Sequence, residues 1–127
     1  MLIEISNGEL VDKVSILEIK NKNILSKEKR KNVEKEYSYL KKKMESIGIS
    51  GMSKEYKDLL EINLKIWELE DKIRNAEKNK LFDENFIHLA RQIYKVNDKR
   101  ATLKKEISEK TNSLFIEEKE PPDYDHK

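Results

Sequence analysis

The sequence predicts an all-α protein, an antiparallel helical bundle or coiled-coil hairpin built from three long helices. Charged residues make up 41 % of the 127 positions and apolar residues only 36 %, so apolar stripes must be narrow. With 3 Gly and 2 Pro, the chain has few residues that end helices. Apolar side chains recur every three or four positions over most of its length, as in long helices with a narrow seam. Because such a core is thin, we expect a second copy to supply part of the burial.

The composition also excludes several classes of protein. The absence of cysteine removes disulfides and cysteine-based zinc sites. No stretch approaches the roughly 18 apolar residues of a membrane span. The N-terminal residues carry no basic segment before an apolar one, unlike a signal peptide. We therefore expect a cytoplasmic protein that makes no use of a membrane.

The first helix is expected to begin after an Asn-Gly pair at positions 7 and 8. The preceding residues alternate like a short strand, but from Leu10 onward apolar positions follow helical spacing. No second alternating strand follows the pair, which argues against a hairpin turn. Ser6 and Glu9 fit a capping box, in which Ser6 accepts a backbone N–H bond and Glu9 reaches back.

The first helical run is expected to be kinked or split near Ser26. Its apolar seam occupies positions 10, 14, 17, 21 and 24, and the next seam occupies 33, 37, 40, 44 and 47. These two registers disagree. Either the helix is continuous with a stutter, or it breaks and Ser26 caps a new helix. We favour the break, and the segment "IGISGMS" at 47–53 is the clearest turn.

Two further helices are expected to form a hairpin. A third helix capped by Ser50 or Ser53 carries apolar positions 59, 62, 66, 69, 73 and 76, a heptad pattern. Asp83 caps a fourth segment with positions 89, 93, 96, 100, 103 and 107. Short turns make neighbouring helices antiparallel. Counting outward from the two turns places Val33, Tyr37 and Val96 beside Trp67, on which all three long helices should converge.

The chain ends are expected to lie outside the long helices. The last helix fades near Lys110, and residues 2–5 and 114–116 could pair as a minor two-stranded ribbon. Residues 1–119 form a single helical domain in this interpretation. Residues 120–127 form an acidic, proline-containing tail that we expect to be flexible.

Three blocks of the sequence resemble a family of small helical bacterial and phage proteins classed as a domain of unknown function. These blocks are "SNGELVDKVSILEIK" at 6–20, "WELEDKIR" at 67–74 and "FIHLARQIYKVNDKRATLKKEI" at 86–107. The resemblance covers residues 3–119. Members of that family tend to have Asp-Pro where this chain has Ser26-Lys27, which supports a helix boundary there. This chain departs by lacking that proline and by carrying the "PPDYDHK" ending. The resemblance implies an architecture but no activity.

The arginines are the most informative polar residues. Lysine outnumbers arginine twenty-three to four, which suggests an AT-rich coding bias. Where arginine is nevertheless present, it can indicate a position that needs a guanidinium group, which binds a carboxylate with two hydrogen bonds. Three arginines lie in the second hairpin. We predict a polar network at its waist, in contact with Trp67 and Tyr94 and formed by Glu70, Arg74, Arg91, Asn97, Asp98 and Arg100.

This network has three interpretations. The one we favour is structural, because buried polar groups fix the register between helices. A sharper alternative is a small anionic ligand or an acidic peptide that contacts Arg74, Arg91, Asn97, Asp98 and Arg100. A third is an enzyme with a carboxylate and arginine site around Glu70, Arg74, Asn97 and Asp98.

The basic segment from Lys20 to Lys43 also has two interpretations. It carries ten Lys or Arg residues and three Glu. A basic stripe near Tyr37 and Tyr39 fits nucleic-acid binding. The interpretation we favour is a solvated helix face with i,i+4 ion pairs.

No residue pattern predicts a catalytic group, metal or cofactor. Glu84 and His88 share one helix face, but no further ligand completes a metal site, and His126 lies in the tail. Serines fall at caps and on polar faces, away from any base and orienting group. We therefore expect a non-enzymatic interaction or scaffold module that works through helix faces and self-associates as a homodimer. The alternative is a nucleic-acid-associated accessory protein using the Lys20–Lys43 face.

Overall fold

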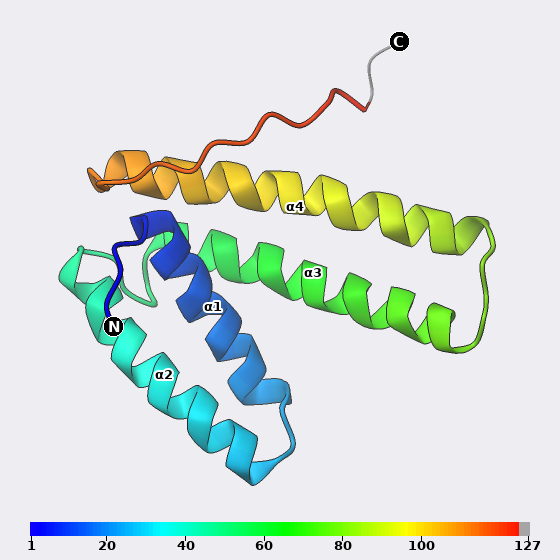
Figure 1. Cartoon of the computed structure of the whole chain (residues 1–127), viewed down its shortest axis with the longest axis horizontal. Coiled ribbons are helices and arrows are strands. Elements are labelled where there is room, and N and C mark those ends of the chain that lie inside the picture. The colour runs from blue at the N-terminus through cyan, green and yellow to red at the C-terminus, as the bar shows by residue number, and fades with distance from the viewer. Residues whose placement is uncertain (125–127) are drawn as a thin grey trace.

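Over residues 1–124, the chain folds into four α-helices that form two antiparallel hairpins (Figure 1). The computed structural model describes residues 1–124. The helices are α1 (Asn7–Asn23), α2 (Lys27–Ser46), α3 (Lys54–Lys78) and α4 (Glu84–Lys110). The long α3–α4 hairpin is crossed at its open end by the shorter α1–α2 hairpin, whose free end points away from it. The prediction of an all-α protein is confirmed.

Helix α1 begins where the sequence indicates. The Ser6 hydroxyl accepts a hydrogen bond from the Glu9 backbone N–H at 3.1 Å. The side chain of Glu9 bonds instead to Lys104 Nζ of α4, at 2.6 Å. The reciprocal half of the capping box is thus replaced by a contact between helices.

The expected break at Ser26 is complete, so the prediction of three long helices is wrong in number. Helix α1 ends at Asn23, and the Ser26 hydroxyl caps α2 by accepting from the Lys29 backbone N–H. The chain reverses there and α2 packs against α1. Two seams in different registers therefore belong to two antiparallel helices.

The predicted two-stranded ribbon is absent from residues 1–124, which contain no strand. Leu2 and Ile3 are exposed. The start of α1 holds the C-terminal segment instead, since the Asn7 backbone N–H donates to Ser113 Oγ at 2.8 Å. Beyond this point the chain turns back and runs along α4 (Figure 1). A position beside α4 lets the segment use the charged side chains of that helix, which a ribbon would not.

The core lies where α1 crosses the open end of the α3–α4 hairpin. Helix α1 contacts each of the other three helices, whereas α2 packs against α1. Buried apolar residues from all four helices and the α2–α3 turn meet there: Leu10, Val11, Val14, Met44, Ile49, Tyr56, Leu59 and Ile107. Buried side chains therefore occur around most of the circumference of α1.

The predicted convergence on Trp67 is wrong for α2. Tyr37 of α2 reaches Tyr56, at the start of α3, and not Trp67. Trp67 is half-buried and lines a cleft beside α1. Helix α1 occupies the position against α3 that the prediction assigned to α2.

Candidate functional site

The polar network is centred on Asp12, a residue of α1 that lies beside the buried Val11. Its carboxylate is completely buried. Arg100 of α4 donates from Nε to Oδ1 at 2.9 Å and from Nη2 to Oδ2 at 2.5 Å. This is the bidentate geometry that an arginine fork favours with a carboxylate. The hydrogen bonds to Asp12 raise the pKa of the Arg100 guanidinium, while burial opposes the shift.

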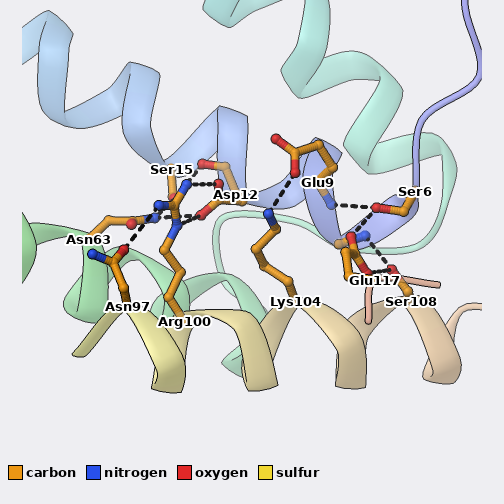
Figure 2. A network of polar contacts seen from close by, with 11 residues as sticks. Ser6, Glu9, Asp12, Ser15, Asn63, Asn97, Arg100, Lys104, Ser108 and Glu117 are labelled. Atoms are coloured by element: carbon orange, nitrogen blue, oxygen red, sulfur yellow. Dashed lines mark hydrogen bonds and ion pairs between the residues drawn. The ribbon is translucent and has the colours of Figure 1, made fainter. Parts of the chain in front are cut away.

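Asn63 brings α3 into the same network (Figure 2). Its side-chain Nδ2 donates to Asp12 Oδ1 at 2.9 Å and to Ser15 Oγ at 2.8 Å. Ser15 in turn donates to the Asp12 carbonyl at 2.7 Å. On the other side, Asn97 Oδ1 accepts from Arg100 Nη1 at 3.4 Å. One buried carboxylate therefore joins three helices, and a shift in their register would leave it without partners.

One turn toward the N-terminus, Gly8 allows α1 and α4 to approach closely. A Cβ atom on Gly8 would lie 2.1 Å from the Lys104 carbonyl oxygen, which is backbone and cannot move aside. The Gly8 backbone N–H donates to Ser108 Oγ at 2.8 Å. The close approach also brings Lys104 to Glu9, so the crossing carries an ion pair as well as a backbone contact.

Glu117, from the segment after α4, closes the network at the first turn of α1 (Figure 2). Ser108 Oγ donates to Glu117 Oε2 at 2.9 Å, and Ser6 Oγ donates to Oε1. Both hydroxyls also accept backbone N–H groups of α1, from Gly8 and Glu9. The carboxylate therefore lies at the positive end of the helix dipole, where an anion is stabilised.

The predicted arginines separate into different surroundings. Arg100 and Asn97 lie together in the network. Arg74 pairs with Glu70 one turn away on α3, at 3.2 Å and on the surface. Arg91 is exposed on α4.

Asp98 and Tyr94 face the segment that follows α4. Asp98 Oδ1 pairs with Lys119 Nζ at 2.7 Å, and this contact lowers the pKa of the Asp98 carboxyl. Tyr94 packs against Tyr124 with ring centroids 4.8 Å apart.

A cleft of about 300 Å³ lies between α1 and α3, beside the network. Its walls include Ile16, Ile66 and Trp67, with Arg74 and Arg100 among the polar residues. Asp98 lines a different hollow, against the C-terminal segment. The four residues of the predicted enzyme site, Glu70, Arg74, Asn97 and Asp98, are therefore divided between two surfaces.

Among residues 1–124, no three potential metal-ligating side chains come together. His88 is exposed on α4. His126 lies outside the described residues. No helix in this part of the chain is both long and apolar enough to cross a membrane.

Sequence reasoning missed several members of the network: Asp12, Ser15, Asn63, Lys104, Ser108 and Glu117. The available signal was in α1, where Asp12 and Ser15 interrupt a run of apolar residues on almost every side of the helix. A carboxylate placed among apolar positions on a helix buried all round needs a cationic partner. The sequence contains no sign of which arginine supplies it.

Comparison with known proteins identifies a family. The match is to "Family of unknown function (DUF6165)" and spans residues 1–123. No curated protein and no solved structure matches the chain. The bacterial or phage origin implied by the resemblance stays a prediction. Since the match covers nearly the whole sequence, the chain belongs to the DUF6165 family of unknown function.

Proposed function

We propose that the protein is a non-enzymatic, cytoplasmic interaction module that self-associates as a homodimer through the outer half of the α3–α4 hairpin, residues 64–94. Helices α1 and α2 pack at the other end of this hairpin (Figure 1). Apart from the cleft in which Ile16 and Ile19 of α1 flank Ile66 and Trp67 of α3, each of the two helices in the outer half has mainly the other to cover its apolar side. The lack of a third helix along most of residues 64–94 is the observation on which the proposal depends.

The exposure of the outer half supports an uncovered surface. Only Ala76 and Leu89 are buried between residues 64 and 94. Seam residues that would be buried in a bundle are only half-buried: Ile66, Leu69, Ile73, Phe86 and Ile93. At the far end, Leu81, Phe82 and Ile87 are each more than half exposed. A second hairpin packed against this one would form a four-helix arrangement and remove these side chains from water.

Sedimentation equilibrium tests the proposal on the full chain. We expect a dimer for the wild type and a monomer for Leu81→Lys/Ile87→Lys, because both lysines would have to be desolvated at the interface. Leu25→Lys is the matched control, since Leu25 is 94 % exposed in the α1–α2 turn, far from the hairpin. A concentration-independent monomer mass for the wild type would refute the proposal.

The alternative, nucleic-acid association through the Lys20–Lys43 face, is supported by the exposure of α2. Lys41 Nζ lies 5.7 Å from the ring centroid of Tyr37, and Lys43 Nζ lies 5.5 Å from that of Tyr39. Basic side chains interleaved with tyrosines offer phosphate contacts and stacking surfaces. A fluorescence polarisation titration with random DNA and RNA at two salt concentrations tests this alternative, which requires binding that weakens with salt.

A further inference from the structure

We propose that the α4 face beneath the C-terminal segment is a docking surface for an extended acidic segment of another protein. The strap, residues 113–124, occupies this surface and competes with that partner. This inference rests on the proposed role as an interaction module, but it does not depend on self-association through the hairpin.

The strap shows how an extended segment lies on α4. It runs back along the helix from its C-terminal end (Figure 1). Glu118 Oε2 pairs with Lys105 Nζ at 3.1 Å, and Lys119 pairs with Asp98 further along. At the end of the described chain, Tyr124 packs on Tyr94.

Charge complementarity favours an acidic occupant. The strap contains four acidic residues and one lysine, a net charge of −3. Residues 91–105 of α4 contain six Lys or Arg residues and one Asp, a net charge of +5, of which Asp12 and Glu9 of α1 offset two positive charges through their pairs with Arg100 and Lys104. Such complementarity guides encounter and sets the register of a bound segment.

The strap covers the surface without filling it. A hollow of about 550 Å³ lies between it and α4, lined on the helix side by Tyr94, Asn97, Arg100, Ala101 and Lys104. A guanidinium has five N–H groups, and the bonds of Arg100 to Asp12 and Asn97 use three of them. This surface can therefore donate further hydrogen bonds to a segment that fits more deeply.

The strap is also held weakly near its middle. The side chains of the Lys105–Glu118 pair are 40 % and 73 % exposed, and exposed ion pairs contribute little to stability. Tethering gives the strap a high effective concentration, so that few contacts keep it on α4, and removing contacts lowers the fraction of molecules in which the strap is bound. A protein segment is favoured over a nucleic acid because the structure already seats a peptide segment here.

A fluorescence polarisation titration with a labelled peptide of residues 113–124 tests the proposal on full-length protein. We compare the wild type with a loosened variant, Glu118→Ala/Tyr124→Ala, which keeps Glu117 and so keeps the contact with α1. Removing one exposed ion pair and one aromatic pair should tighten peptide binding by roughly tenfold. Lys105→Glu in the loosened variant should reverse that gain, and a Glu118→Lys peptide should bind this charge-reversed protein better than the native peptide does. Lys72→Glu, on the exposed surface of α3, is the matched control.

The outcomes separate this inference from the proposed self-association. Peptide binding that depends on Lys105 supports the docking surface whether sedimentation finds monomers or dimers. No binding to the loosened variant, or an equal effect of Lys105→Glu and Lys72→Glu, would overturn it. Displacement of the peptide by a random DNA at moderate salt would also overturn the inference. A dimer that disappears in the loosened variant would overturn it as well, because that result would assign the surface to the C-terminal segment of a second copy.

Discussion

Replacing Asp12 by alanine should be among the most destabilising single changes in the chain. The substitution removes both acceptors of the Arg100 fork and one acceptor of Asn63. Removing one partner of a buried pair costs about 3–5 kcal/mol, chiefly because the other charge stays buried. The Arg100 side chain is 27 % exposed and can regain some hydration, and Asn63 keeps its bond to Ser15. We therefore expect the free energy of unfolding to fall by about 2–4 kcal/mol.

Urea unfolding followed by circular dichroism measures this loss, and an unchanged m-value shows that the transition itself is unchanged. Glu70→Ala is the matched control, because it breaks the exposed pair with Arg74 and should cost about 0–1 kcal/mol. The double variant Asp12→Leu/Arg100→Met should cost less than the sum of the two single changes, since it leaves no uncompensated charge. A loss below about 1 kcal/mol for Asp12→Ala would refute the central role assigned to this carboxylate.

Two further predictions concern the same junction. Gly8→Ala should lower the free energy of unfolding by about 1–3 kcal/mol in the same urea assay, because its Cβ would overlap the Lys104 carbonyl. Gly51→Ala, where a Cβ meets nothing within 4 Å, should cost nothing, and equal losses for the two would contradict the close approach. Burial, followed by the hydrogen bond with Glu18, raises the pKa of Tyr56, so folding favours its protonated form. The stabilisation from protonated Tyr56 is fully present below the pKa of tyrosine in the unfolded chain and is lost as the pH rises above about 10. Above that pH the wild type should lose free energy of unfolding more steeply than Tyr56→Phe. Parallel losses for the two proteins would contradict the raised pKa of Tyr56.

Local signals in the sequence predicted most of the secondary structure. Ser6, Ser26 and Asp83 each accept the expected capping bond from the backbone. Ser53 also begins a helix, but its hydroxyl accepts from the Ser50 backbone N–H in the preceding turn. Caps and turns depend on residues a few positions apart, so a single sequence carries enough information to find them.

The pairing between helices was harder to predict, because the rule that short turns make neighbours antiparallel does not say which helix packs on which face of another. It placed α3 and α4 together correctly and then assigned α2 to Trp67. Helix α1 takes that position because it is apolar on almost all sides and needs three neighbours, whereas α2 has one narrow apolar stripe. Within the network, Arg100 and Asn97 were anticipated on α4, while the carboxylate between them and α3 came from a helix 88 positions earlier.

The sequence by itself determined that this protein is helical and where its helices begin. It also excluded disulfides and cysteine-based zinc sites, because the chain has no cysteine. These features follow from composition and from side chains within one or two turns of each other. Only the tertiary structure decided that Asp12 binds Arg100, that Gly8 must lack a side chain, and that residues 113–124 lie on α4. Each of these depends on how closely and at what angle α1 crosses α4, and that geometry is set by packing among all four helices at once.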